Sequence, residues 1–191
     1  YHLGQADTTQ AVALLSALSN QQLENESTIS GRFLLANLHK SRSDFGKAFE
    51  LLNQIRTKTP YSHYADSALV HLAEISYVNR QYQDALTFIK ELRERQENYR
   101  RSNLKTLPAI SLHLEGLIHQ QLGRPLEATR SYLTYLQHYP TTTESASVLR
   151  ALAQMATETQ MFNLARNYLA ELISSARDSV HVCQARLPRA T

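Results

Sequence analysis

The sequence contains one cysteine, no tryptophan, and only five glycines and five prolines among 191 residues. A single cysteine excludes a disulfide framework and a zinc site built on cysteines. The scarcity of glycine and proline argues against an all-β fold with many tight turns. No apolar run approaches the ~18 residues that a membrane-spanning helix needs, and no signal peptide is visible. Because the sequence does not begin with methionine, we expect it to be a trimmed or mature part of a longer chain.

Basic and acidic residues nearly balance, so the net charge is also small. The formal net charge is +3, and the basic excess lies in residues 90–105. Nucleic-acid-binding proteins usually carry a broader basic face, so we expect no nucleic-acid partner. Within this segment Arg100 and Arg101 are candidates for a secondary contact with a partner. Apolar residues make up 42% of the chain, which is enough to form a buried core.

An internal repeat stands out against this background. An alanine followed by large apolar residues four and seven positions later recurs at Ala11, Ala48, Ala85, Ala128 and Ala165. The spacing is 37 residues, except for 43 residues in the third interval. Twelve residues before each of the last four alanines stands another small residue, namely Ala36, Ala73, Gly116 and Ala153. Three residues before the same alanines stand Phe45, Tyr82, Pro125 and Phe162.

The apolar spacing within each unit predicts two amphipathic helices joined by a short turn. The two small positions let the paired helices approach closely, and the aromatic residue or proline should begin the second helix, where an aromatic ring would wedge between the two. Pro60 and Pro140 should end second helices. We therefore expect helices at 5–20, 27–42, 45–58, 64–79, 82–98, 107–122, 125–138, 144–159 and 162–176, followed by a loosely structured tail at 178–191.

This pattern resembles the tetratricopeptide repeat family. The third unit carries most of the motif, with Leu112, Gly116, the segment 123–128, Tyr132 and Pro140. The chain departs from the family in its period, which is ~34 residues there, in lacking the motif tryptophan, and in two missing prolines. The segment 60–69 further resembles the linker of such repeats in bacterial envelope-assembly proteins.

The resemblance implies an all-α fold, a right-handed superhelix of antiparallel helix pairs with about four and a half repeats. It implies one domain over residues 1–191, with a half repeat at 5–20 and repeats at 27–60, 64–98, 107–140 and 144–177. The period breaks between Arg95 and Pro108, where the six extra residues would lengthen either a helix or a loop. The half repeat lacks a partner helix, so uncovered end helices could form a homo-oligomer.

The resemblance also implies that the first helix of each pair lines a concave groove. Counted onto this chain, the groove positions are Phe33, Asn37, Lys40, Val70, His71, Glu74, Tyr77, His113, Leu117, Gln120, Gln121, Arg150, Gln154 and Thr157. This mixed surface suits a peptide or a partner helix. The clamp by which some family members hold an acidic chaperone tail is absent, since only Asn37 matches it, and the other clamp positions carry Phe33, His71, Ile110 and Leu114.

No catalytic or metal-binding motif is present. The sequence lacks a glycine-rich phosphate loop, H-E-x-x-H and G-x-S-x-G. His113 and His119 are six residues apart, which puts them on different faces of one helix. His63 and His71 are eight residues apart, and we expect a helix to begin between them. Cys183 near His181 has no orienting acid or oxyanion motif. We expect no enzyme activity, no metal and no cofactor.

Together these features favour a non-enzymatic scaffold that binds a protein or peptide in the groove, without inserting into a membrane. Alternatives remain open at this point. The domain could sense an effector within a longer signalling or transcription-regulating protein, or it could act as a spacer. A less favoured alternative is an enzyme or an RNA binder. The sequence leaves the compartment open between the cytoplasm and a bacterial periplasm.

Overall fold

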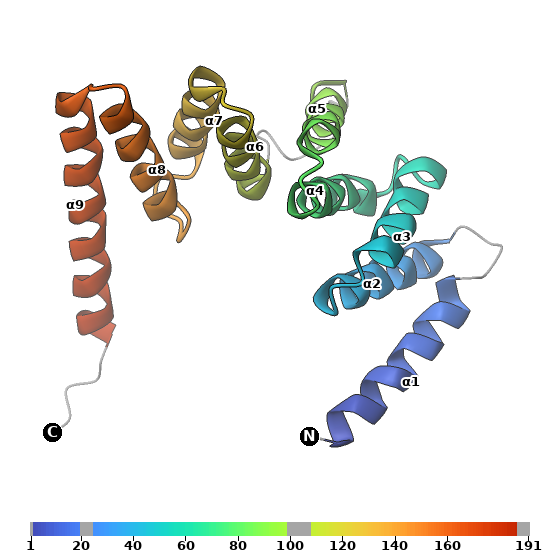
Figure 1. Ribbon diagram of the computed structural model, residues 1–191. Coiled ribbons are helices and arrows are strands. Elements are labelled where there is room, and N and C mark those ends of the chain that lie inside the picture. The colour runs from blue at the N-terminus through green and yellow to red at the C-terminus, as the bar shows by residue number, and fades with distance from the viewer. Residues whose placement is uncertain (1, 20–24, 99–107, 187–191) are drawn as a thin grey trace, which may run out of the picture. The chain divides into compact units, whose positions relative to one another are not determined.

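The computed structural model describes residues 2–19, 25–98 and 108–186, with side chains described for 10–19, 25–98 and 108–175. In these residues the fold is all-α (Figure 1). The helices are α1 (His2–Ser19), α2 (Glu26–Ser41), α3 (Phe45–Lys58), α4 (His63–Val78), α5 (Tyr82–Asn98), α6 (Ala109–Gln121), α7 (Pro125–His138), α8 (Ser145–Glu158) and α9 (Phe162–Arg186). They form two compact units, one ending at Leu107 and the other beginning at Pro108.

The predicted helix boundaries agree closely with those in the structure. The helices α3, α5, α7 and α9 begin at Phe45, Tyr82, Pro125 and Phe162, as predicted. Both α3 and α7 end two residues before a proline. A proline disfavours helical backbone in the residue before it, which explains these two ends.

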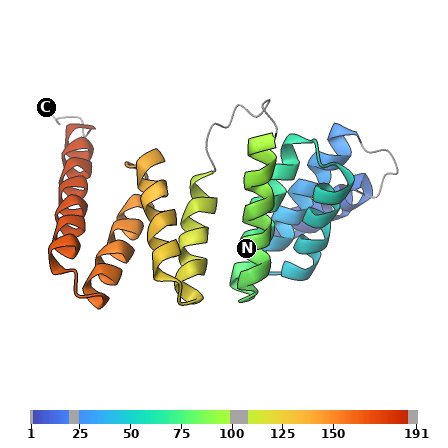
Figure 2. The same cartoon turned by 90° about the horizontal axis from the view of Figure 1, so that it is seen from above.

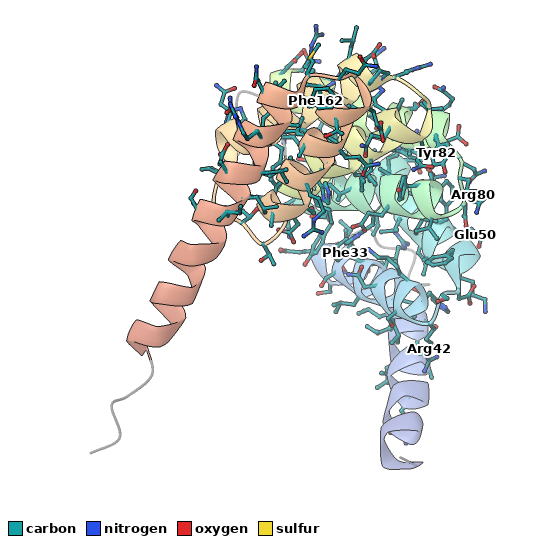
Figure 3. The ribbon with its side chains drawn as sticks, turned by 60° about the vertical axis from the view of Figure 1, so that its left-hand side comes forward. Phe33, Arg42, Glu50, Arg80, Tyr82 and Phe162 are labelled. Carbon is teal, nitrogen blue, oxygen red and sulfur yellow. The ribbon has the colours of Figure 1, made fainter. Side chains whose placement is uncertain are left out.

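The chain departs from our expectations at its C-terminal end. We predicted a tail without regular structure from residue 178, but α9 continues to Arg186. The segment 174–186 contains neither glycine nor proline, so nothing in it interrupts the helix. We also expected Phe162 to wedge between paired helices, and this was wrong, because its side chain is 64% exposed (Figure 3).

The unit boundary coincides with the break in the repeat period. In the first unit α5 reaches Asn98, the last described residue before the break. Residues 99–107 lie outside the described part of the chain. The single-domain organisation over residues 1–191 therefore stays a prediction, and the two units are treated separately below.

The same turn joins the two helices of each pair. In every such turn one residue has a left-handed backbone, with φ of 61° at Ser43, 60° at Arg80, 66° at Gly123 and 61° at Gln160. The N–H of Ser43 donates to the carbonyl of Lys40 at 3.0 Å, and the next N–H donates to the carbonyl of His39 at 2.9 Å. Equivalent bonds close the other three turns. This is the Schellman motif, which satisfies the last carbonyls of a helix.

The paired helices meet at the small residues of the repeat. The motif alanines Ala48, Ala85, Ala128 and Ala165 are no more than 5% exposed, and so are Ala36, Ala73 and Ala153. At Gly116 the helices approach so closely that an added Cβ atom would lie 2.3 Å from Cε1 of Tyr132. The ring of Tyr132 thus occupies the space that a side chain at Gly116 would need.

In the first unit α1 packs on α2. Leu18 lies over Gly31, where an added Cβ would meet its side chain at 2.7 Å. Arg32 is only 3% exposed, and its Nε donates to the carbonyl of Ser19 at 3.1 Å. This bond satisfies a carbonyl at the C-terminal end of α1, where a cation is also favoured by the helix dipole.

We expect Gly116→Ala to destabilise the chain by about 1–3 kcal/mol, because the new methyl group would overlap the ring of Tyr132. Chemical denaturation followed by circular dichroism measures the effect. Gly46→Ala is the matched control: outside its chain neighbours and the backbone of its own helix, no described atom lies within 4 Å of its added Cβ, so the variant should be neutral or more stable by ~0.5–1 kcal/mol. Equal stability of both variants and the parent would contradict the close approach.

We also expect Arg80→Gly to stabilise the chain by about 0.5–1 kcal/mol, because glycine adopts a left-handed backbone without steric cost. Gly123→Ala in the equivalent turn should do the reverse and destabilise it by about 1 kcal/mol. Thermal melts of the two variants measure these opposite shifts. Shifts of the same sign would show that the left-handed backbone does not determine how these substitutions change the stability.

Candidate functional site

Aromatic side chains of α2 and α4 gather on one surface of the first unit. The ring of Phe33 on α2 lies 5.3 Å from that of Tyr64 and 5.6 Å from that of His71, both on α4. His63 stacks on Tyr64 at 3.9 Å. Phe33, Tyr64 and His71 are all partly exposed. We call this set of four rings the aromatic patch.

Beside the aromatic patch, Lys40, His71 and Glu74 form a polar cluster. Lys40 and Glu74 form an ion pair, and Nδ1 of His71 lies 2.7 Å from Nζ of Lys40 and 2.8 Å from Oε2 of Glu74. Burial raises the pKa of Glu74, but hydrogen bonds to His71 and Lys40 outweigh burial, so this pKa lies below its ordinary value. The carboxylate therefore neutralises the ammonium group, and Lys40 is already paired.

Asn37 lies between the aromatic patch and the polar cluster on α2. It follows Phe33 by one helical turn and precedes Lys40 by three residues, so the three side chains share one side of the helix. Asn37 is half-buried, and its amide makes no hydrogen bond to another described residue. An amide has two donors and an acceptor, so Asn37 can bind a backbone that approaches this surface.

Two other predicted groove residues of the first unit, Val70 and Tyr77, lie outside the aromatic patch and the polar cluster. Val70 is only 7% exposed and belongs to the core. Tyr77 packs against Tyr82 at 5.8 Å between ring centroids, and burial together with Tyr82 raises its pKa. Val78, which the groove count did not include, is 56% exposed. Of the predicted groove residues of the first unit, Phe33, Asn37, Lys40, His71, Glu74 and Tyr77 are partly exposed.

In the second unit two predicted residues are engaged inside the fold. His113 lies 6.3 Å from the ring of Tyr132 and 6.0 Å from that of Tyr135, and burial lowers its pKa. The hydroxyl of Tyr132 donates to Oε1 of Gln120 at 2.7 Å. These contacts hold α6 against α7, so His113 and Gln120 contribute to packing.

The remaining predicted residues of the second unit are more open. Leu117 is half-buried, and Gln121, Arg150, Gln154 and Thr157 are exposed. The amide of Gln154 donates to Glu158 at 2.9 Å on the same helix. The structure does not gather these side chains into a cluster comparable to the aromatic patch.

The basic segment is largely paired where the structure describes it. Arg95 binds Glu91 at 2.8 Å and donates to the carbonyl of Pro60 at 2.7 Å. Arg56 also binds Glu91, at 3.1 Å. These bonds tie α5 to α3 and to the α3–α4 connection. Arg100 and Arg101, the candidates for a secondary contact, lie outside the described residues, and so do the side chains of His181 and Cys183.

No group of three or more His, Cys, Asp or Glu side chains among the described residues could hold a metal ion. None of the described helices is both long enough and apolar enough to cross a bilayer.

Comparison with known proteins identifies the fold. No protein-family model matches the sequence, and no curated protein sequence matches it. Solved structures do match. A crystal structure of MamA superposes with a TM-score of 0.75 at 12% identity, over 93% of this chain and 94% of that one. MamA from Desulfovibrio magneticus RS-1, from residue 41 to its end, gives a TM-score of 0.71 at 12% identity, over 92% and 89%.

A third match is a putative kinesin light chain of Podosopora anserina with nearly identical TPR-like repeats. It gives a TM-score of 0.67 at 19% identity, over 92% of this chain and 90% of that one. The fold is therefore an all-α helical repeat of the tetratricopeptide type, as the sequence predicted.

Two members of the aromatic patch, Tyr64 and His63, were not among the predicted groove residues. The signal was present, because three aromatic or imidazole side chains stand within residues 61–64. The helix was predicted to begin at Tyr64, and a helix start was expected between His63 and His71. This was wrong, because α4 begins at His63, so His63 lies on the same first helix as Tyr64 and His71.

We expect Glu74→Gln to destabilise the chain at neutral pH by about 0.5–1 kcal/mol, through loss of the ion pair with Lys40. Because the pKa of Glu74 is lowered in the folded state, its contribution is complete above the ordinary value of 4.5 and is lost as the pH falls through the lowered value. The gap between variant and parent should therefore narrow below pH 4.5.

Denaturant unfolding at several pH values measures this gap. Glu50→Gln is the matched control, because Glu50 is exposed on α3 and should not change the pH dependence (Figure 3). A gap that stays constant from neutral to acidic pH would show that Glu74 does not stabilise the fold through its charge.

Proposed function

We propose that this chain is a non-enzymatic scaffold that binds a segment of a partner protein across α2 and α4 of the first unit. The observation that carries the proposal is the half-buried amide of Asn37, which bonds to no other described residue. A polar group in this state is satisfied by water or by a ligand. A peptide backbone can replace that water with equivalent hydrogen bonds.

The neighbours of Asn37 define what such a segment would contact. On one side the aromatic patch offers the partly exposed rings of Phe33, Tyr64 and His71. Aromatic anchors supply much of the affinity at protein interfaces, whereas amides fix the register of the bound chain. The patch therefore suits an apolar or aromatic side chain of the partner, placed next to a backbone group that bonds to Asn37.

The polar cluster restricts the charge of the ligand. Lys40 is paired with Glu74 and lies next to His71, so it does not offer a free ammonium group to a carboxylate. Breaking this pair would leave Glu74 partly buried without its partner, which is unfavourable. We therefore propose an uncharged segment as the ligand and disfavour an acidic tail.

The remaining groove positions are proposed as secondary contacts. In the second unit the exposed candidates are Gln121, Arg150 and Gln154, and the half-buried Leu117 lies one helical turn before Gln121. The tetratricopeptide-type fold of the solved structures supports a scaffold in general. No feature of the described residues favours an effector-sensing domain over this proposal.

A phage-displayed library of random peptides provides a direct test. Selected peptides should be rich in aromatic or aliphatic residues and poor in charge. Asn37→Ala should weaken their binding by about tenfold, through loss of hydrogen bonds in a desolvated contact, and Phe33→Ala should weaken it by ten- to about a hundredfold. Fluorescence anisotropy with labelled peptides measures both effects.

Asn167→Ala is the matched control, because Asn167 is an exposed amide on α9 of the second unit. It should leave peptide binding unchanged, and all variants should show the circular dichroism of the parent. Recovery of no binding peptide, or equal binding by Asn37→Ala and the parent, would overturn the proposal.

A further inference from the structure

His71 belongs to both the aromatic patch and the polar cluster. Its ring lies 5.6 Å from that of Phe33, and its Nδ1 atom lies 2.7 Å from Nζ of Lys40 and 2.8 Å from Oε2 of Glu74. Lys40 stands on α2, whereas His71 and Glu74 stand on α4. These two helices contact each other, and α3 packs on both (Figure 2). A single ring nitrogen therefore faces both members of an ion pair.

Neutral His71 leaves that ion pair intact. A ring nitrogen without a proton accepts a hydrogen bond, whereas a ring nitrogen with a proton donates one. When Nδ1 carries no proton, it accepts from the Lys40 ammonium group, which donates to Glu74 with another of its three hydrogens. Lys40 is then held by both neighbours, and the three side chains together are uncharged.

Protonation of His71 changes the partner of Glu74. An imidazolium donates from both ring nitrogens, so Nδ1 donates to Oε2 of Glu74 in a charge-assisted hydrogen bond. Lys40 then loses its acceptor on the ring and faces a second cation at close range, which repels it. Because the side chain of Lys40 is 30% exposed, its ammonium group can turn outward. The imidazolium thus replaces Lys40 on Glu74.

Glu74 stays ionised while this exchange takes place. Histidine ordinarily changes its charge between about pH 5 and pH 8. Burial raises the pKa of Glu74, but hydrogen bonds from His71 and Lys40 hold this pKa below its ordinary value of 4.5. Moving Lys40 away from a partly buried carboxylate would be unfavourable if nothing replaced it, and the imidazolium is that replacement. The three side chains together therefore change from neutral to singly positive.

The groups that face His71 are Lys40 from α2 and Glu74 from its own helix. Among the described residues, no charged side chain of α3 or α5 contacts the ring of His71. Several charged side chains on the elements that pack on α4 are paired with one another, namely His39 with Asp44, Lys47 with Asp44, Arg56 with Glu91, Arg95 with Glu91, and Lys90 with Glu94. The charge of His71 therefore acts chiefly on the Lys40–Glu74 pair.

From this geometry we infer that His71 determines the charge of the segment that the first unit accepts, an inference that rests on the proposed function. Near neutral pH, Lys40 stays with Glu74, and an uncharged segment is preferred. When His71 is protonated, it binds Glu74 and makes the Lys40 ammonium group available to a carboxylate of the partner. An acidic segment is then preferred on the same surface, beside Asn37.

Peptide binding at two pH values tests the inference. The phage-displayed library is selected at about pH 7.5 and at about pH 5.5. Selected peptides are then compared with variants in which single residues beside the apolar anchor are changed to glutamate, which stays ionised over this range. We expect the preference for the glutamate variants over the uncharged peptides to rise about tenfold at the lower pH. Fluorescence anisotropy measures both affinities.

Two histidine variants identify the responsible ring. His71→Gln should remove the rise, because an amide side chain does not gain a proton in this range. His63→Gln is the matched control and should keep the rise, because His63 lies on the aromatic patch but contacts neither Lys40 nor Glu74. Both variants should show the helical circular dichroism of the parent.

Proton NMR of the free chain tests the exchange without a ligand. The Cε1 proton of the His71 ring reports the fraction of protonated imidazole as the pH is changed. Lys40→Met removes a competing cation and should move the midpoint of this titration upward by about half a pH unit or more. Glu74→Gln removes the acceptor of the imidazolium and should move the midpoint downward. Midpoints that stay in place in both variants would overturn the inference.

The binding results separate a failure of the inference from a failure of the proposed function. Peptides that bind with the same charge preference at both pH values would overturn the inference and leave the proposed function standing. A rise that persists in His71→Gln, or disappears in His63→Gln, would do the same. Recovery of no peptide at either pH would overturn the proposed function, and the inference with it.

Discussion

The close approach of paired helices at small residues is the constraint on which the rest of the structure depends. With Ala36, Ala73, Gly116 and Ala153 on one helix and the motif alanines on the other, large side chains from both can interdigitate around them. Because the first helix of a pair is thereby held at a fixed distance from the second, its opposite side is left facing outward. Residues such as Phe33, Asn37 and His71 owe their exposure to this arrangement.

The pair formed by Gly116 and Tyr132 shows how the repeat tolerates variation. Other repeats combine an alanine with a leucine or isoleucine, such as Ala36 with Leu52. Here a larger side chain on one helix is matched by a smaller residue on the other, so the combined volume is nearly conserved. The hydroxyl of Tyr132 gains a hydrogen bond to Gln120. Gln120, which the resemblance assigns to the groove, thus bonds to a residue of the paired helix.

Helix positions could be predicted well from the sequence because they follow from local rules. The residues that begin α3, α5, α7 and α9 were identified from spacing alone, and two prolines marked helix ends. The length of α9 was not predicted. Residues 174–186 contain no glycine or proline that would end a helix, but the lack of such a residue is only weak evidence that a helix continues. Two of the left-handed turn residues, Arg80 and Gln160, also gave little signal, since neither residue type favours that backbone.

The candidate site was harder to predict, because contacts between different helices decide it. Counting along each first helix indicates which residues share a side, but it does not reveal that Lys40 pairs with Glu74, 34 residues away. It also cannot separate Val70, which is buried, from His71, its neighbour in sequence. Asn37 could be named from the sequence, whereas its lack of a bonding partner among the described residues required the structure.

The pairing of Lys40 with Glu74 has a kinetic consequence. A surface whose charges cancel locally creates almost no long-range field, so it does not draw a ligand in from a distance. Encounter with a partner would then proceed at the unassisted rates of about 10⁵–10⁶ M⁻¹s⁻¹ typical of neutral surfaces. The Lys40–Glu74 pair would therefore add little dependence of these rates on ionic strength, since it creates almost no field for salt to screen. Discrimination between partners would therefore arise after contact, in the lifetime of the complex.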